Sequence, residues 1–259
     1  MPALRRVSVS RYVTPLREGG SLPAIVEADD DGLYVLKFRG AGQGANALVA
    51  ELVSGEIARA LGLPVPEIVF AELDADLART EPDPEIFALL RASAGLNLAL
   101  DYLPGSVMFD PVVEKAGAEL ASRIVWFDAY VTNVDRTVRN TNMLMWHRRL
   151  WLIDHGATLY FHHSQGWAAD LARARAPFPL VKDHVLLRTA SLLQEIDASM
   201  AGTLTPEVIT GIVELIPDQW LGDGASPGEA GHYRAAYRRY LLDRLESPRA
   251  FVAEAVDAR

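Results

Sequence analysis

Residues 133–161 read NVDRTVRNTNMLMWHRRLWLIDHGATLYF, and this stretch decides the fold that the chain is expected to adopt. Two short apolar runs, MLMW and LWLI, flank a basic break, which predicts a hairpin. Asp135 and Asn140 precede the first run, and Asp154 follows the second. Because the strands of a hairpin run antiparallel, these three polar side chains are expected together at one end of a sheet.

The chemistry of these side chains indicates a site for metal-dependent phosphoryl transfer. Asp135 can accept the hydrogen bond of a substrate hydroxyl and direct its oxygen at a phosphate. Asn140 offers an uncharged oxygen and Asp154 an anionic one, and Mg²⁺ prefers such hard oxygen ligands. Asn142 lies directly before the first apolar run and is an alternative ligand to Asn140. Each short motif also occurs by chance, but the combined pattern favours phosphoryl transfer.

The composition bounds the class of protein. The chain has 259 residues, 50% of them hydrophobic, which is enough for one large domain or for two lobes that share a cleft. The formal net charge of −9 disfavours direct binding to nucleic acid or anionic membranes, since both are polyanions. The absence of cysteine excludes disulfides and cysteine nucleophiles, and a cytoplasmic protein is expected. Neither a signal peptide nor a membrane-spanning segment is predicted.

Apolar periodicity predicts an α+β protein, with strands before about residue 105 and helices after it, apart from the central hairpin. The expected strands cover residues 7–13, 24–28, 33–38, 67–73, 96–103, 143–146 and 150–153. The expected helices cover residues 46–61, 82–94, 112–131, 184–200, 206–216, 229–245 and 248–256. The turn at Pro104-Gly105 predicts a boundary between a lobe over residues 1–103 and a lobe over residues 104–259.

Three features in the first part of the chain could contribute to a phosphate site. Gly19-Gly20 marks a turn whose backbone can approach a ligand closely. Lys37 lies near the end of a predicted strand, and Glu51 lies on the predicted helix that follows. Taken alone, each feature is more typical of a surface turn, an exposed lysine or a solvated helix face. The glycine loop over residues 40–44 lacks the GK[ST] ending of a Walker A loop and predicts a connection only.

The segments NVDRTVRN, LWLIDHG and ALGLPVP, the last following Glu51, together resemble the HipA-like kinases and, more distantly, the phosphatidylinositol kinases. The resemblance runs from about residue 16 to about residue 216, most of the chain. It implies a two-lobed protein-kinase-like fold, with a small β-rich lobe and a mostly helical one, and ATP and Mg²⁺ as cofactors. The chain is much shorter than full HipA toxins, so a HipB-like DNA-binding partner is not expected.

The resemblance also implies roles for residues in the first lobe. Lys37 would contact the α- and β-phosphates of ATP, and Glu51 would pair with Lys37. The phosphate loop would be formed by Gly19, Gly20 and Ser21. The adenine pocket would be lined by Leu100, Asp101 and Leu103.

In the second lobe, the resemblance implies that Asp135 is the catalytic aspartate and that Arg136 neutralises charge beside it. Asn140 and Asp154 would bind Mg²⁺. Asn140 is preferred to Asn142 because the five-residue spacing from Asp135 is the one that kinases use.

The segment over residues 162–178 has a mixed composition and matches no substrate-binding motif. It begins with His162 and His163, a polar pair of the kind that is usually exposed, and no separate metal site is expected there. The identity of the substrate therefore does not follow from the resemblance.

Three functions are compatible with these expectations. The leading one is an ATP- and Mg²⁺-dependent kinase that phosphorylates a serine or threonine hydroxyl of a protein, ahead of a small molecule or lipid. The second is a pseudokinase that binds nucleotide without transfer, although a module freed from catalysis need not keep all five candidate site residues. The third is an AMP transferase that holds ATP in a flipped pose on the same metal site.

Overall fold

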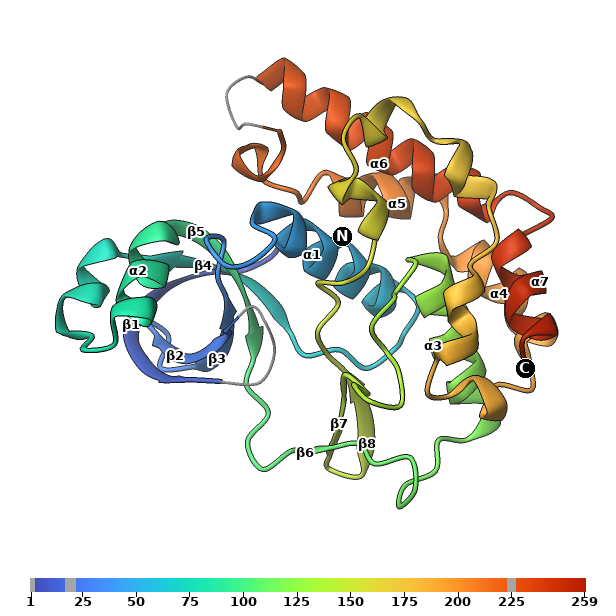
Figure 1. Ribbon diagram of the computed structural model, residues 1–259, viewed down its shortest axis with the longest axis horizontal. Helices are drawn as coiled ribbons and strands as arrows, with labels where there is room; N and C mark the ends of the chain where they lie inside the picture. The colour runs from blue at the N-terminus through green and yellow to red at the C-terminus, as the bar shows by residue number, and fades with distance from the viewer. Residues whose placement is uncertain (1–2, 17–21, 223–226) are drawn as a thin grey trace.

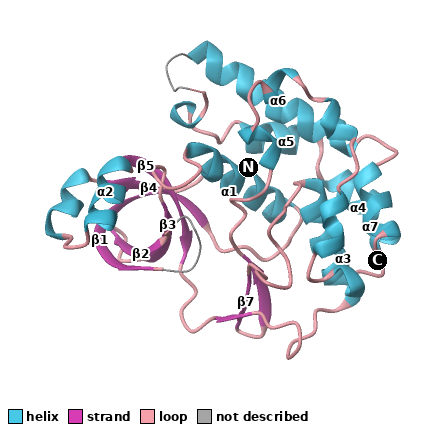
Figure 2. Ribbon diagram, in the orientation of Figure 1, coloured by secondary structure: helices cyan, strands magenta, loops and turns pink. Residues whose placement is uncertain are grey.

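The chain is a mixed α+β protein in which a closed barrel lies beside a mostly helical part (Figure 1, Figure 2). The computed structural model describes residues 3–16, 22–222 and 227–259. The barrel strands are β1 (Arg6–Pro15), β2 (Ala24–Ala28), β3 (Leu33–Lys37), β4 (Ile68–Leu73) and β5 (Gly95–Asp101). The other strands are β6 (Val107–Met108), β7 (Met143–Trp146) and β8 (Arg149–Leu152). The α-helices are α1 (Ala45–Ala60), α2 (Pro84–Ala92), α3 (Ala118–Tyr130), α4 (Leu193–Thr203), α5 (Pro206–Val213), α6 (Pro227–Leu245) and α7 (Ala250–Asp257).

A pairing between β1 and β4 closes the barrel. The strand order is β1-β2-β3-β5-β4, and β1 runs parallel to β4 with Arg6 opposite Phe70. The other neighbouring strands of the barrel run antiparallel. The predicted hairpin between β2 and β3 is confirmed, and Asp31 in its turn has a φ of 59°. The strands were predictable from periodicity, but the closure was not, because periodicity along one strand does not identify a distant partner.

The barrel and the helices have separate hydrophobic cores, and α1 belongs to the second core. The barrel core contains inward-facing side chains such as Val26 and Leu36. The other core joins Leu52 and its neighbours on α1 to α3 and the C-terminal helices. Gly55 allows α1 to lie close to the barrel, because a Cβ atom there would be 2.4 Å from the Cδ1 atom of Ile68. Helix α1 therefore links the two parts.

The predicted central hairpin is confirmed as the pair β7–β8. Met143 lies opposite Leu152, and β6 adds a third strand on the β7 side. His147 and Arg148 both have a positive φ, 47° and 61°, as the central residues of a type I′ turn require. The backbone N–H of Leu152 donates to the carbonyl of Pro64 at 2.8 Å, which fixes the hairpin to the connection between α1 and β4.

Helix α3 is shorter than the helix predicted over residues 112–131. It begins at Ala118, and its N-cap is Gly117, in an extended conformation with φ −65° and ψ 154°. Val112 and Val113, at the start of the predicted range, lie outside the helix and are 82% and 74% exposed. The predicted helix thus began too early. Gly117 disfavours helical geometry, and the apolar spacing by itself does not show that the helix starts only after it.

Residues 153–192, all of them described, contain no α-helix but a series of short 3₁₀ helices. These cover Tyr160–His163, Trp167–Ala169, Ala172–Arg175, Pro179–Asp183 and Leu187–Thr189. The helix predicted over residues 184–200 is therefore wrong in its first half, and α4 begins only at Leu193. One reason is that the His184 ring accepts the backbone N–H of Leu186 at 3.0 Å, a local bond that competes with a regular helix.

Arg244 on α6 ties this segment to the end of α3. Its Nε and Nη2 atoms donate to the carbonyls of Tyr130 and Ala129, each at 2.8 Å. Its Nη1 atom donates to the carbonyls of Ala174 and Ala176 at 2.9 and 3.0 Å. The side chain is buried, so these bonds satisfy the last carbonyls of α3, which have no partner within the helix.

Aromatic contacts pack the C-terminal helices against α3. Trp126 stacks on Tyr130 with ring centroids 5.4 Å apart and meets Phe251 of α7 edge-on at the same distance. Trp220 reaches the barrel, where its ring N–H donates to the carbonyl of Leu96 at 3.3 Å. None of the helices in the described parts of the chain is long and apolar enough to cross a membrane.

Candidate active site

Lys37 is held between two carboxylates from distant parts of the chain. Its Nζ atom lies 2.6 Å from Oδ1 of Asp154 and 3.5 Å from Oε2 of Glu51. Lys37 ends β3, Glu51 lies on α1 and Asp154 follows β8, so the group joins the barrel to the helical part. The Glu51 side chain is 1% exposed, whereas that of Asp154 is 42% exposed. One carboxylate is thus a buried partner of the lysine, and the other faces solvent.

Burial and charge together set the protonation of this group. Burial by itself lowers the pKa of Lys37, but Glu51 and Asp154 outweigh burial and raise the pKa above its ordinary value. Burial raises the pKa of Glu51, but Lys37 and His155 outweigh it and hold the pKa well below its ordinary value. Lys37 is therefore a cation and Glu51 an anion at neutral pH.

His155 contacts the other oxygen of Glu51. Its Nδ1 atom lies 3.3 Å from Oε1 of Glu51, and its ring packs edge-on against Phe127 with centroids 5.7 Å apart. The side chain is fully buried. Thr158 donates to the His155 carbonyl at 2.8 Å and shares a 2.6 Å hydrogen bond with Ser54 of α1. The segment after β8 is thereby held against α1, and the orientation of Glu51 depends on it.

Asp135 accepts two amide hydrogen bonds through a single carboxylate oxygen. Asn140 Nδ2 donates to Oδ2 at 2.7 Å, and Asn142 Nδ2 donates to the same oxygen at 3.1 Å. The Asp135 backbone N–H donates to Oδ1 of Asn133 at 3.0 Å. The second carboxylate oxygen, Oδ1, has no partner among the described residues and can accept a further hydrogen bond.

A backbone hydrogen bond brings Asp154 to the Asp135 loop. The N–H of Ile153 donates to the carbonyl of Asn142 at 3.0 Å, one step beyond the ladder of the hairpin. Asn142 and Asp154 have positive φ values of 45° and 54°, so the chain turns sharply at both strand ends. Asn142 is buried, whereas Asn140 is half-buried, which makes the Asn140 amide the more accessible of the two.

The Arg136 side chain pairs with a buried carboxylate on α3. Its guanidinium is fully buried, Nε donates to Oδ2 of Asp128 at 2.6 Å, and Nη1 donates to the carbonyl of Asn142. A buried cation requires a buried anion, and Asp128 on α3 supplies it. These bonds brace the loop that runs from Asp135 to Asn142. A role of Arg136 in neutralising charge beside Asp135 stays a prediction.

Asp128 is the centre of a buried group in which both of its carboxylate oxygens accept hydrogen bonds. Besides Arg136, it accepts from Asn133 Nδ2 at 2.7 Å and from His184 Nε2 at 2.8 Å. Because His184 Nδ1 accepts the N–H of Leu186, the ring proton lies on Nε2, and a neutral imidazole makes both bonds. Burial raises the pKa of Asp128, but Arg136, His184 and Asn133 outweigh it and lower the pKa to about 2.

Sequence reasoning does not identify Asp128, His155 or His184 as part of the site. Asp128 carries the one usable signal, because it is a lone charge in the apolar run IVWFDAYV and such a charge requires a buried partner. His155 directly follows Asp154, and nothing in the sequence around it points to its contact with Glu51 on α1. His184 lies 56 residues from Asp128 along the chain, and no local pattern connects them.

The other residues predicted to contact the nucleotide are the phosphate loop and three residues at the end of β5. The predicted phosphate loop, Gly19, Gly20 and Ser21, lies outside the described residues. Leu100 on β5 and Leu103 after it are buried, while Asp101 is exposed. Partial burial and the nearby Glu67 carboxylate raise the pKa of Asp101. Contacts from these three residues to an adenine base stay predictions.

His162 is buried, which corrects the expectation of an exposed pair. Its Nδ1 atom lies 2.8 Å from the Tyr237 hydroxyl, and its Nε2 atom lies 3.1 Å from Nε2 of His163. Burial, with a smaller effect of His163, lowers the pKa of His162 to about 3. The ring is therefore neutral and packs between the segment after β8 and α6.

The HipA-like kinase family model matches residues 9–249. The chain belongs to the HipA-like kinase family. The matched region includes the Lys37–Glu51 pair and the whole hairpin from Asp135 to Asp154, and the family supports a phosphotransferase. A comparison with curated proteins gives no match.

Three solved structures resemble this HipA-like kinase at low sequence identity. The Helicobacter pylori proinflammatory kinase CtkA is 13% identical, with 99% of this chain and 98% of that chain covered and a TM-score of 0.49. The Golgi casein kinase with Mn and ADP bound is 12% identical, with 96% and 75% covered and a TM-score of 0.48. A further structure of the Golgi casein kinase is 13% identical, with 100% and 74% covered and a TM-score of 0.47.

Proposed function

We propose that the chain is an ATP- and Mg²⁺-dependent kinase that phosphorylates a serine or threonine hydroxyl of a protein. Residues 1–103 and 104–259 would act as two lobes, the first supplying the lysine and the second the catalytic loop. The observation that carries the proposal is the single charged group of Lys37, Glu51 and Asp154, which forms where the hairpin returns to the catalytic loop.

The residues present fit a Mg²⁺ ion bound together with a nucleotide. Asp154 offers a solvent-facing carboxylate and Asn140 an accessible amide oxygen, and both are hard ligands. Within the described parts of the chain, no group of three or more His, Asp or Glu side chains could hold a metal. Phosphate and water oxygens would complete the shell, as is usual for Mg²⁺, and the ion would supply charge neutralisation on the phosphates.

Lys37 would hold the phosphates of ATP. It lies closer to Asp154 than to Glu51, so it can exchange the exposed carboxylate for a phosphate oxygen and keep the buried one. Its raised pKa keeps it charged throughout the physiological range. Glu51, bound also by His155, would keep the ammonium at the site during this exchange.

Asp135 would receive the proton of the substrate hydroxyl. Asn140 and Asn142 occupy its Oδ2 atom, which leaves Oδ1 to accept the hydroxyl hydrogen bond. The proton would pass to Asp135 as the oxygen bonds to the γ-phosphorus and the bond to the ADP oxygen breaks. Because Arg136 braces this loop against Asp128, the carboxylate is oriented before the substrate arrives.

Transfer assays with labelled nucleotide test the proposal. The purified chain is incubated with Mg²⁺ and ATP labelled at either the α- or the γ-phosphate, with casein added as a protein acceptor. We expect label from the γ-position only, on serine or threonine. Label from the α-position would indicate an AMP transferase, and nucleotide binding without any transfer would indicate a pseudokinase; both contradict the proposal.

Two variants separate the metal site from the catalytic carboxylate. Asp154→Ala should abolish Mg²⁺-dependent ATP binding, whereas Asp135→Ala should abolish transfer and leave ATP binding. Asp76→Ala, which removes an exposed carboxylate before α2, is the matched control and should change neither. Transfer that survives Asp154→Ala would show that the metal site is wrongly assigned.

A further inference from the structure

A basic hollow borders the loop that carries Asp135. It has a volume of about 900 Å³ and is lined by residues 137–139 of the loop, by residues from 182 to 188 and by the two residues after α7. The cationic side chains that line it are Arg139, Lys182, Arg188 and Arg259. Asp183 is the only carboxylate side chain among the described residues of its lining. The hollow is therefore positively charged in a chain whose net charge is −9.

The cations of this hollow are not neutralised by the protein itself. Arg139, Lys182 and Arg188 are exposed, and none of them forms a hydrogen bond or ion pair with a residue that the structure describes. Surface arginines of the barrel behave differently, since Arg5 and Arg11 bind carboxylates at 2.8 and 2.6 Å. The unpaired cations are therefore available to an anionic partner.

The hollow lies next to the proposed acceptor site. Arg139 immediately precedes Asn140, whose amide donates to Oδ2 of Asp135 at 2.7 Å. The N–H of Thr137 donates to the carbonyls of Asp135 and Asn140 at 2.9 and 3.0 Å, so the loop folds back and keeps Arg139 in the same turn. A β-bridge between Thr137 and His184 joins the loop to the second wall of the hollow.

We propose that this hollow binds acidic residues of the protein substrate close to the hydroxyl that is phosphorylated. The inference rests on the proposed kinase function and names its substrate class, a peptide segment with several aspartate or glutamate side chains. Cations spread over three segments suit carboxylates spaced along an extended chain better than a single compact anion. Val138, 69% exposed beside Arg139, offers an apolar contact to the same segment.

A nucleic acid fits this face less well than an acidic peptide does. The overall charge of −9 repels a long polyanion, whereas a short acidic segment meets only the local positive charge. The described lining also contains no Phe, Tyr or Trp side chain on which a base could stack.

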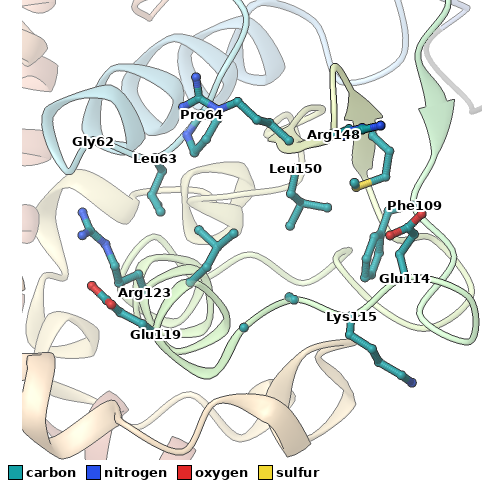
Figure 3. Close-up of a pocket in the computed structure, with 15 residues that line it drawn as sticks. Gly62, Leu63, Pro64, Phe109, Glu114, Lys115, Glu119, Arg123, Arg148 and Leu150 are labelled. Atoms are coloured by element: carbon teal, nitrogen blue, oxygen red, sulfur yellow. The ribbon is translucent and has the colours of Figure 1, made fainter.

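A second hollow provides a matched control surface (Figure 3). It has a volume of about 550 Å³ and lies between the α1–β4 connection, the start of α3 and the β7–β8 hairpin. Cations and carboxylates share its lining, which includes Lys115, Arg123, Arg148 and Arg149 together with Glu114 and Glu119. Reversing its three exposed cations changes the net charge as much as reversing those of the basic hollow.

The test is peptide binding by fluorescence anisotropy, without nucleotide. The probes are short labelled peptides with one serine flanked on both sides by glutamate, by glutamine or by lysine. They are titrated with the wild-type chain, with the Arg139→Glu, Lys182→Glu, Arg188→Glu variant and with the Lys115→Glu, Arg148→Glu, Arg149→Glu control. Thermal unfolding and ATP binding show that both variants are folded.

We expect the wild-type chain to bind the glutamate peptide at least about tenfold more tightly than the glutamine peptide at low salt, with a smaller preference at high salt. The basic-hollow variant should lose this preference and favour the lysine peptide, while the control should keep it. Equal binding of the glutamate and glutamine peptides to the wild-type chain would overturn the inference, as would an equal loss of preference in the two variants.

Failure of the kinase proposal gives a different result from failure of this inference. A chain that binds the glutamate peptide through the hollow but transfers no label from γ-labelled ATP contradicts the kinase and supports the acidic docking site. A chain that phosphorylates the three peptides equally well supports the kinase and overturns the docking site.

Discussion

Glu51 and Asp128 are two buried carboxylates that each face one cation and one histidine. Glu51 lies 3.5 Å from Lys37 and 3.3 Å from His155. Asp128 lies 2.6 Å from Arg136 and 2.8 Å from His184. Both groups contain the same types of side chain, but the distances to the carboxylate are longer around Glu51 than around Asp128. We call the first group loosely bound and the second tightly bound.

The surroundings of the two groups explain this difference. The Glu51 group joins the barrel to the helical part and ends in Asp154, which is exposed to solvent. Its Oε2 atom is buried without a hydrogen bond from any described residue. The Asp128 group lies wholly within the helical part, and both of its carboxylate oxygens accept hydrogen bonds. The Nη2 atom of Arg136 is likewise buried without a partner among the described residues, so the two groups differ at the carboxylate: Asp128 is hydrogen-bonded at both oxygens and Glu51 at one.

The largest expected effect is on stability, at the tightly bound group. Arg136→Met leaves the Asp128 carboxylate buried without its cation, and we expect the free energy of unfolding to fall by about 3–5 kcal/mol. Urea unfolding followed by circular dichroism measures this change. Arg136→Lys keeps the charge and should lower the free energy of unfolding by less. A decrease below about 1 kcal/mol in Arg136→Met would show that the burial of Asp128 does not depend on the arginine.

The corresponding change at the loosely bound group should affect catalysis more than stability. Lys37→Met removes the proposed phosphate contact, and we expect phosphoryl transfer to slow by about 10²–10³-fold, or about 3–4 kcal/mol in the transition state. The free energy of unfolding should fall by less than in Arg136→Met, because Asp154 can turn to solvent and Glu51 keeps His155. Parallel rate and urea-unfolding measurements decide this, and equal destabilisation by the two variants would remove the distinction between the groups.

The pH dependence of stability should reveal the Asp128 group. The pKa of Asp128 is about 2 in the folded chain, below its unfolded value, so its stabilising contribution is complete above about pH 5. As the pH falls through the folded pKa, the carboxylate takes up a proton, and we expect the free energy of unfolding to fall by about 2–3 kcal/mol. Urea unfolding from pH 7 to pH 2 should therefore show a steeper decline in the wild-type chain than in Asp128→Asn. If the free energy of unfolding declines equally with pH in the two proteins, protonation of Asp128 is not the cause of the decline.

The smallest expected effect concerns His155. His155→Phe keeps an aromatic ring against Phe127 but removes the contact to Glu51, and we expect kcat/KM for ATP to fall by about 5- to 30-fold, or about 1–2 kcal/mol. His155→Asn supplies an N–H near the position of Nδ1 and should recover part of the activity. If the asparagine variant is no better than the phenylalanine variant, packing rather than the bond to Glu51 is what matters.

Local patterns predict much of this fold. The β2–β3 and β7–β8 hairpins and helix α1 follow from alternation, helical periodicity and turn residues within short windows. The closure of the barrel depends on β1 meeting β4, some sixty residues away, and no local pattern encodes that pairing. The start of α3 was placed too early because apolar residues continue beyond its N-cap at Gly117.

The candidate site also contains residues that local spacing predicts and residues that depend on contacts between distant segments. Asp135, Asn140 and Asp154 can be chosen from one hairpin, since their spacing is itself the signal. The burial of Arg136 and its pairing with Asp128 depend on the packing of α3, which spacing does not describe. The candidate site residues of one hairpin are thus easier to choose from the sequence than the buried residues that hold this hairpin in place.

Arg244 has a consequence for how this protein can change over evolution. All four of its hydrogen bonds end on main-chain carbonyls, two of them in the segment over residues 172–176. Every amino acid carries that carbonyl, so side chains in the segment can be replaced without breaking the tie to α3. A library that randomises the other positions of this segment and retains both Arg244 and the buried Ala174 should therefore yield many folded variants.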